Sequence, residues 1–261
     1  MTPALPAARQ RLARARSTPF DPAWLLERHL TVDIAEAISS LEQGVVIDVG
    51  CGGRPYEEFV PSGARYIGLD LTPTLGSWPD CWARADAIPI AGGAAALVLC
   101  TQVLEHLPDP HRCVAEIARV LAPGGRLVLT APQTWNLHEA PHDYYRFTRY
   151  GLEHLCVQAG LEVVDIRPQG GLGAALGLSI LMYVGTKALG GDAQTTAELG
   201  RSWLRALLRW PLVLHNVAFA LLDGWRGRGL GAGVFAVNHL IVAAKPAAAS
   251  QTDREARSTG A

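Results

Sequence analysis

The chain has 261 residues, of which 49% are hydrophobic and 18% charged, and its formal net charge is −1. This composition excludes a disordered chain, because the apolar fraction is high and the net charge is small. The near-neutral balance also argues against nucleic acid as a partner, since phosphate binding requires a basic surface. We expect one elaborated globular domain, or one domain with a sizeable insertion.

The five cysteines are scattered, with no C-x-x-C pair and no Cys/His grouping at zinc spacing. We interpret them as reduced and mostly buried thiols, which indicates a reducing compartment. The Arg-rich N-terminus lacks the apolar stretch of a secretory signal. The sequence thus predicts a cytoplasmic protein with no metal site, and an apolar segment described below leaves membrane association open.

Periodicity predicts the elements in chain order. A helix is expected over 24–41, where apolar residues recur at helical spacing until Gln43-Gly44. Short Val/Ile/Leu runs that follow predict strands, and amphipathic stretches predict helices. The strands are expected over 45–49, 66–71, 97–100, 126–130, 161–167 and 237–245, and the helices over 110–121 and 148–159. Continuous apolar runs favour strands buried on both faces, and their alternation with helices predicts a parallel sheet.

One segment interrupts this alternation with strongly apolar sequence. We expect a flexible arm over 1–23, a core over 24–169, an apolar helical insertion over 170–233, a last core strand over 234–246 and a disordered tail over 247–261.

Within the insertion, Arg201, Arg205 and Arg209 recur on one helical face among Trp and Leu, and Pro211 is predicted to kink or end that helix. Such a helix is typical of a membrane interface. A cap over a pocket, a homodimer face, a peripheral membrane contact and a membrane span all remain open.

The most informative stretch is VVIDVGCGGRPY, residues 45–56. A buried strand ends with Asp48, and the glycines that follow let the backbone turn sharply and approach a ligand. Ligands of open α/β sheets bind at the carboxyl ends of strands, where this loop should lie. A carboxylate beside the loop favours a cationic ligand group, since a diphosphate prefers amides with no acid nearby.

Two further acids follow later strand candidates. Asp70 ends the next strand in YIGLDL, where a doubly wound fold places a carboxylate that accepts both ribose hydroxyls. Asp86, in ARADAIPI, is expected where a third strand ends, and its carboxylate can accept from an exocyclic amine such as that of adenine. With Asp48, these acids predict a pocket for a cationic, ribose-bearing adenosyl ligand.

These segments, in this order, resemble the class I S-adenosylmethionine-dependent methyltransferases, in particular the small-molecule group that shares DvGCGxG. The matching segments are DVGCGG, GLDL, ADAIPI, LVLCTQVLEHLPDP and LAPGGRLVLTAP. Where that family often has a third glycine, this chain has Arg54-Pro55-Tyr56, which implies a tighter loop. The resemblance implies a Rossmann-like, doubly wound, seven-stranded and mostly parallel sheet whose last strand is antiparallel, with the helical insertion before it.

The resemblance also implies roles for individual residues toward S-adenosylmethionine (SAM). Asp70 would bind the ribose hydroxyls, with Leu71 against the adenine and with Asp86 and Ala87 at its edge. The methionine part and the transferred methyl would be bordered by Asp48, Gly50, Cys51, Gly52, Tyr56, Thr101 and Gln102.

The acceptor side is expected on two loops that follow the fourth and fifth strands. His142 and His106 are the candidate general bases for removing an acceptor proton. The candidate substrate-binding residues are His138, Asp143, Tyr144, Tyr145 and Arg146. Two structural alternatives stay open: His106, with Glu105, only orders the following helix, or the HDYYRF run is a clasp in which Arg146 pairs with Asp143.

The sequence therefore predicts a methyltransferase acting on a small-molecule, lipid-linked or glycan-linked acceptor, at oxygen rather than at nitrogen or carbon. The alternative is a non-catalytic SAM-binding scaffold whose insertion recruits a partner or a membrane. A nicotinamide-dependent oxidoreductase is disfavoured, because Asp48 precedes the glycines and G-x-G-x-x-G is absent.

Overall fold

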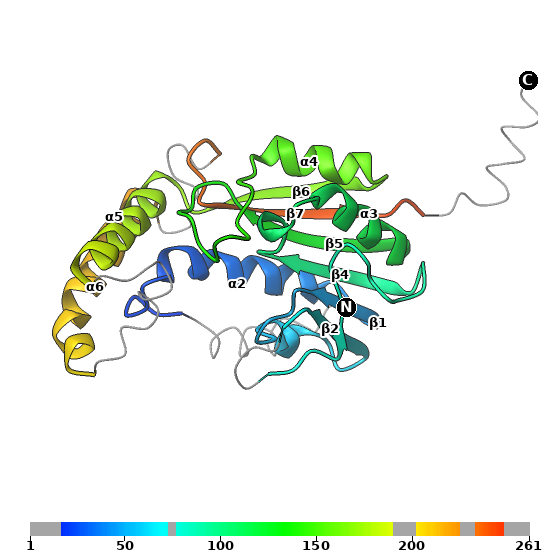
Figure 1. The fold of residues 1–261 in the computed structure, drawn as a ribbon, viewed down its shortest axis with the longest axis horizontal. Coiled ribbons are helices and arrows are strands. Elements are labelled where there is room, and N and C mark those ends of the chain that lie inside the picture. The colour runs from blue at the N-terminus through cyan, green and yellow to red at the C-terminus, as the bar shows by residue number, and fades with distance from the viewer. Residues whose placement is uncertain (1–16, 73–76, 190–201, 225–232, 248–261) are drawn as a thin grey trace, which may run out of the picture.

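The structure is a computed structural model that describes residues 17–72, 77–189, 202–224 and 233–247. Its centre is a seven-stranded sheet in the order β3-β2-β1-β4-β5-β7-β6 (Figure 1). The strands are β1 (Gly44–Val49), β2 (Ala64–Asp70), β3 (Cys81–Trp82), β4 (Ala95–Thr101), β5 (Leu121–Pro132), β6 (Glu162–Gln169) and β7 (Asn238–Ala244).

Strand pairing confirms the expected fold class. β1 pairs in parallel with β2 and β4, and β4 pairs in parallel with β5. β7 alone runs antiparallel to its neighbours β5 and β6. The parallel strands therefore end at a common edge, which we call the carboxyl edge, and loops that follow them meet there.

Helices cover both faces of the sheet, as the uninterrupted apolar strands predicted. On one face α2 (Trp24–Ser39) and the short helix η1 (Glu57–Phe59) pack on Val46, Leu99 and Val128. On the other face α3 (Pro110–Val120) and α4 (Arg149–Gln158) pack on Ile47, Val98 and Leu129. Alternate residues of each strand thus enter two separate cores.

Local sequence explains where the elements begin. α3 starts at Pro110, and its N-cap Asp109 accepts a hydrogen bond from the Arg112 backbone N–H. α3 ends at Val120, and β5 starts at Leu121, so Pro123-Gly124-Gly125 belongs to the strand rather than to a separate turn. Backbone hydrogen bonds from Gly124 to Lys245 and from Lys245 to Gly125 hold this stretch beside β7.

The third strand differs from the expectation. β3 is only Cys81–Trp82, paired at the edge of the sheet with Leu69 and Asp70 of β2. The prediction that Asp86 ends a strand is therefore wrong, because Asp86 lies in a turn beyond β3. In the run ADAIPI, Pro89 lacks the backbone N–H that a strand ladder needs, so the run does not extend the edge strand.

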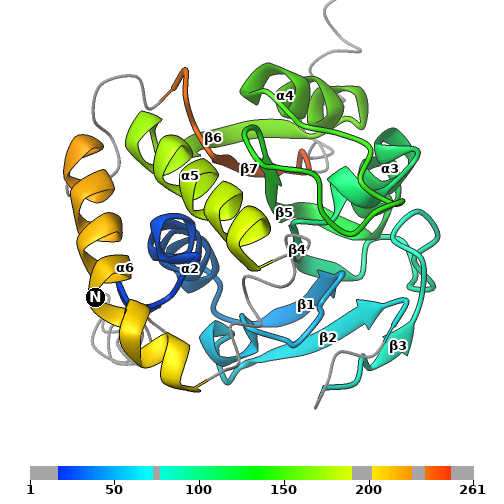
Figure 2. The same ribbon diagram turned by 60° about the vertical axis from the view of Figure 1, so that its left-hand side comes forward.

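The apolar segment between β6 and β7 contains two long helices, α5 (Leu172–Leu189) and α6 (Ser202–Leu222). They lie side by side and flank the first turns of α2 (Figure 2). Gly173 and Gly177 allow the two helices to approach closely, because a Cβ at either position would collide with Phe219. Pro211 lies inside α6 and does not end it.

A buried acid joins the end of α6 to the start of α5. The Asp223 carboxylate accepts backbone N–H groups of Gly171, Gly173 and Ala174 at 2.6–3.0 Å. These donors are the unpaired amides of the first turn of α5, so Asp223 caps that helix from a distant part of the sequence. Helices α5 and α6, joined in this way, pack on Trp24 and Leu25 of α2.

The outer faces of α5 and α6 are apolar and exposed. The large apolar side chains on these faces are Leu172, Leu176, Ile180, Tyr183 and Val184 on α5 and Trp210, Leu214, Leu221 and Leu222 on α6. Most of them recur three or four residues apart, so each helix presents one continuous apolar stripe. In the part of the chain described, no helix is both long and apolar enough to cross a membrane.

Several sequence predictions fall on residues outside the described ranges. They concern residues 1–16 of the predicted arm, the tail from 248 onward and Arg201. Arg205 and Arg209 lie in α6, but the structure does not describe their side chains.

Candidate functional site

The glycine-rich loop after β1 turns back onto the end of β2. The backbone N–H groups of Gly50 and Cys51 both donate to the Leu69 carbonyl, at 2.8 and 3.0 Å. Gly50 has a φ of 72°, and a Cβ at this position would collide with the Val103 side chain. Glycine is therefore required here, both for the left-handed backbone and for the close approach of the loop after β4.

Asp48 is fully buried at the end of β1, directly behind this loop. The Tyr66 hydroxyl donates to Asp48 Oδ2 at 2.6 Å, whereas Asp48 Oδ1 has no hydrogen-bond partner in the described structure. Burial raises the pKa of the Asp48 carboxyl to about 7, and the Tyr66 hydrogen bond lowers it only in part. A cation arriving at the loop would stabilise the ionised form of Asp48.

Asp70 is the last residue of β2 and organises the same loop. Its Oδ2 accepts the Gly52 backbone N–H at 2.9 Å, and its Oδ1 accepts those of Leu71 at 2.7 Å and Thr72 at 3.2 Å. The negative charge of Asp70 also raises the pKa of Asp48. The structure therefore brings Asp48, Gly50, Cys51, Gly52 and Asp70 together, as the strand-end pattern predicted.

Tyr56 of the loop after β1 and residues at the end of β4 complete this edge. The Tyr56 side chain is buried beside Thr101, and burial raises the pKa of its hydroxyl. Gln102 adopts a φ of 55°, and its side-chain amide donates to Thr130 Oγ1 and Asn238 Oδ1 at 3.1 and 2.9 Å. This left-handed conformation, uncommon for a glutamine, turns the chain away from the sheet at the carboxyl edge.

Asp86 and Ala87 lie beyond β3, in the turn that follows it. The Asp86 carboxylate pairs with Arg84, with Nε to Oδ1 at 2.8 Å and Nη2 to Oδ2 at 2.9 Å. Leu71, next to Asp70, is exposed, and its apolar side chain is free to contact a ligand.

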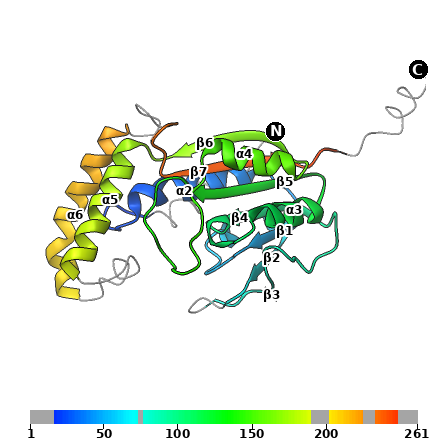
Figure 3. The same ribbon diagram turned by 45° about the horizontal axis from the view of Figure 1, so that its top comes forward.

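The 133–147 loop extends from β5 over the carboxyl edge toward α5 (Figure 3). Arg146 holds the loop together: it pairs with both oxygens of Asp143 at 2.6 and 2.7 Å and donates to the carbonyls of Trp135 and Asn136. This ion pair lowers the pKa of Asp143. The predicted pairing of Arg146 with Asp143 is therefore present, and it occupies both charged groups.

Backbone contacts attach the 133–147 loop to the short helix η2 (Leu104–His106) after β4. The N–H groups of Tyr144 and Tyr145 donate to the Glu105 carbonyl, and His106 Nδ1 lies 2.8 Å from the His142 carbonyl oxygen. His142 is exposed, with Nδ1 3.1 Å from the Tyr144 hydroxyl. The predicted acceptor-side residues therefore gather at one place, beside the end of β4.

Sequence reasoning missed several residues that shape this edge. Arg54 pairs with Asp80 and Glu57, each at 3.0 Å, and its guanidinium lies 4.9 Å from the Tyr66 ring. Asp80 in turn accepts the Gly68 backbone N–H at 2.8 Å. Asp80 shares no motif with Arg54 or Tyr66, so only the folded sheet reveals these contacts.

Comparison with known proteins identifies the class. A family model described as "Methyltransferase domain" matches residues 47–129. A ubiquinone biosynthesis O-methyltransferase of Aromatoleum aromaticum is 30% identical over 169 residues, which cover 52% of this chain and 72% of the relative. One of Xanthomonas oryzae pv. oryzae is 27% identical over 229 residues, 82% of each chain.

A solved structure gives the same fold with a different named activity. The crystal structure of the cyclase SpnF aligns with a TM-score of 0.54 at 19% identity, covering 86% of this chain and 83% of that one. This likeness supports the fold alone, because unrelated chemistries share it.

The chain belongs to the class I SAM-dependent methyltransferases, and SAM is its cofactor. The described residues fit a cationic ligand of this kind. Two carboxylates, Asp48 and Asp70, flank the glycine loop, one oxygen of Asp48 is buried without a partner, and the nearby Arg54 is already paired with other acids. The carboxyl edge of β1, β2 and β4 is thus an anionic cradle that lacks its counter-charge.

Proposed function

We propose that this methyltransferase transfers a methyl group to an oxygen of a small-molecule acceptor, including acceptors that carry a lipid tail or a glycan. The observation that supports this proposal is the 133–147 loop, whose backbone extends over the carboxyl edge (Figure 3) and which carries His142 and Tyr144, with the His142 Nδ1 3.1 Å from the Tyr144 hydroxyl. The names of the relatives at 27–30% identity, which are O-methyltransferases, support oxygen as the methylated atom.

On the cofactor side, each residue has a proposed role. When bound, SAM supplies a methyl group activated on a positively charged sulfur. Asp70 would accept the ribose hydroxyls, and its position at the end of β2 beside Gly52 supports this role. Leu71, Asp86 and Ala87 would contact the adenine. Residues proposed near the methionine part are Asp48, Gly50, Cys51, Gly52, Tyr56, Thr101 and Gln102.

Asp48 would act by charge rather than by direct contact, because its side chain is fully enclosed behind the glycine loop. At short range in a buried environment, a carboxylate interacts strongly with a cation even without touching it.

On the acceptor side, His142 and His106 are the proposed groups for removing the hydroxyl proton. The exposed ring of His142 can reach a ligand, whereas His106 is only partly exposed and its Nδ1 faces the His142 carbonyl. Tyr144 and Tyr145 expose 45% and 39% of their surface, which suits contact with an aromatic or sugar ring. His138 would line the same surface, and the paired Asp143 and Arg146 would hold the loop in shape.

The segment 170–233 is proposed to serve the acceptor. It starts and ends at the carboxyl edge, and Trp135 of the 133–147 loop packs against the cluster that α5 and α6 form with α2. The exposed apolar stripes of the two helices favour contact with an apolar partner, such as a lipid surface that carries the acceptor or a second copy of the chain. The core would then be 24–169 with 234–246.

The test uses the full chain, SAM with an isotope-labelled methyl group, and a panel of phenolic and glycosidic hydroxyl acceptors with and without a prenyl tail. We expect label transfer and a product heavier by one methylene, with no transfer to acceptors whose hydroxyl is already methylated. SAM binding without turnover on this panel and on a cell extract would favour the non-catalytic scaffold. Binding of NAD in place of SAM would overturn the cofactor assignment.

A further inference from the structure

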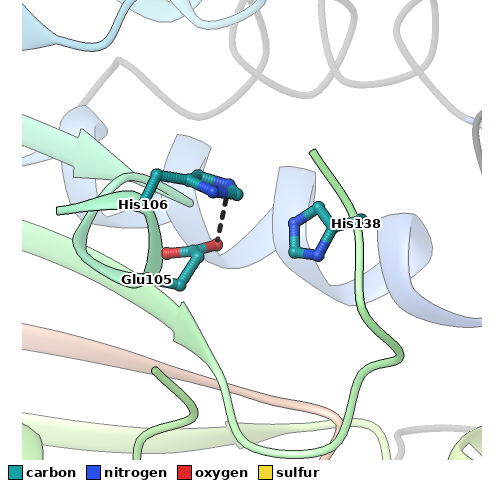
Figure 4. Close-up of side chains that lie close together, drawn as sticks. All are labelled: Glu105, His106 and His138. Carbon is teal, nitrogen blue, oxygen red and sulfur yellow. Dashed lines mark ion pairs between the residues drawn. The ribbon is translucent and has the colours of Figure 1, made fainter. Parts of the chain in front are cut away.

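Three side chains near the 133–147 loop converge although their spacing in the sequence matches no ligand motif. One nitrogen or oxygen atom each of Glu105, His106 and His138 lies within 4.8 Å of those of the other two (Figure 4). Glu105 and His106 come from η2 after β4, and His138 comes from the loop after β5. The sequence predicted no metal site because it shows no ligand grouping at zinc spacing, whereas the fold brings these three side chains together.

Glu105 provides an independent sign that something binds here. Its side chain is completely buried, and neither carboxylate oxygen has a hydrogen-bond partner in the described part of the chain. The nearest ring nitrogen, Nε2 of His106, lies 3.9 Å from Oε1 of Glu105. A buried carboxylate without a hydrogen bond is costly, so this oxygen pair favours a proton or a bound cation.

The two histidines are oriented by contacts through Nδ1. His106 Nδ1 lies 2.8 Å from the His142 carbonyl oxygen. His138 Nδ1 lies 3.2 Å from Oδ2 of Asp143 and 3.3 Å from the Asn136 carbonyl oxygen, with Arg146 Nη2 at 3.4 Å. A carbonyl or carboxylate at Nδ1 fixes the tautomer that leaves Nε2 as the electron-pair donor. The Asp143 carboxylate is itself fixed by Arg146, so the ring of His138 is supported on a rigid base.

We propose that Glu105, His106 and His138 bind one divalent transition-metal ion, with Zn²⁺ as the best match. Two imidazoles and one carboxylate suit Zn²⁺ and related first-row ions, while Mg²⁺ prefers an all-oxygen shell. Ligand atoms of a tetrahedral Zn²⁺ site lie about 3.3 Å apart, so the distances between these atoms must shorten by up to about 1.5 Å. Three protein ligands leave one position open to an oxygen of the acceptor.

The role of this ion rests on the proposed function, whereas its binding does not. An ion bound at Glu105 would lie on the acceptor side, where it would orient a hydroxyl and favour its ionised form. His106 would then act as a ligand, and His142 would remain as the group that takes up the proton.

The test is titration of the untagged, metal-free full chain with ZnCl₂ by isothermal calorimetry, and with CoCl₂ by visible absorption. We expect one Zn²⁺ per chain, and Co²⁺ absorption bands of a four- or five-coordinate site. Zn²⁺ at about 100 times its Kd should raise Tm by about 5–10 °C. Glu105→Gln and His138→Ala should each weaken Zn²⁺ binding at least 30-fold and abolish this rise.

The matched control is the double variant His111→Ala/His154→Ala, which removes two neighbouring histidines of α3 and α4 whose rings lie 6.4 Å apart. It should bind Zn²⁺ like the unaltered chain. The proposal is overturned if no stoichiometric ion binds, if the control loses the ion, or if His138→Ala binds it normally. His138 lies on a loop, so its variant decides the question even if Glu105→Gln does not fold.

SAM titration of the same samples separates the two proposals. Absent Zn²⁺ binding with intact SAM binding overturns the metal site alone. If the chain binds both SAM and Zn²⁺ but transfers no methyl group to any acceptor, the proposed function is contradicted and the metal site is not.

Discussion

Replacing Asp70 with alanine tests the cofactor cradle most directly. A ribose offers two hydroxyl donors to this carboxylate, and a hydrogen bond to a charged group contributes about 1.5–3 kcal/mol. Losing both should cost at least about 3 kcal/mol of binding free energy, which weakens SAM binding about 100-fold or more. The SAM affinity of Asp70→Asn should lie between those of the unaltered chain and of Asp70→Ala, because asparagine keeps one acceptor oxygen but no charge.

The folded state should survive this change. The carboxylate also accepts the N–H groups of Gly52, Leu71 and Thr72, but Leu71 and Thr72 are exposed, and water can replace the lost acceptor there. We expect a loss of about 1 kcal/mol in stability, or a few degrees in Tm.

Calorimetric titration with SAM and urea unfolding measure the two effects separately. Asp165→Ala, on β6 and paired only with Arg167 among the described residues, is the matched control and should leave SAM affinity unchanged. A folded Asp70→Ala variant that binds SAM within threefold of the unaltered chain would refute the assignment of Asp70 to the ribose.

Three further predictions concern the charge of Asp48, the 133–147 loop and the exposed apolar stripes of α5 and α6. Burial raises the pKa of Asp48 to about 7, so between about pH 4 and pH 7 the native state holds a proton that the unfolded chain has lost, and stability falls as pH rises through this window. Asp48→Asn should therefore raise Tm at pH 8 but not at pH 4, and should remove the gain in SAM affinity on going from pH 6 to pH 8; equal Tm differences at both pH values would contradict this. Arg146→Lys cannot reproduce the two-pronged contact with Asp143, so kcat/KM for the acceptor should fall at least tenfold while SAM affinity stays constant, and a parallel loss of SAM affinity would argue against a loop-specific role. Ile180→Ser combined with Leu214→Ser should change Tm by less than about 2 °C, because both side chains are exposed, but should reduce vesicle pelleting or self-association; unchanged pelleting and mass would remove the exposed stripes from consideration.

Much of the sheet was predictable because its signals are local. The apolar run before Asp48 and the spacing to Asp70 reflect strands buried on both faces, and these features follow from a few consecutive residues. The antiparallel last strand came from family resemblance instead, since periodicity does not give strand direction. The length of β3 was missed because a two-residue edge strand has no periodicity to detect.

The candidate site was predictable only where its residues follow strands. The cluster of Glu105, His106 and His138 forms because the loops after β4 and β5 meet, and the contact between His106 and the His142 carbonyl that joins them has no signal in the sequence. The burial of Glu105 likewise depends on how the 133–147 loop lies over η2.

The segment between β6 and β7 leaves and re-enters the sheet at neighbouring positions, since Gln169 and Asn238 are paired in register. Its two ends are therefore held together whatever lies between them. The entropy of closing such a loop increases only slowly with length, so added residues there cost little stability as long as α5 and α6 keep their contacts with α2. If the segment serves the acceptor as proposed, grafting it between relatives should change the acceptor while the donor half of the protein stays constant.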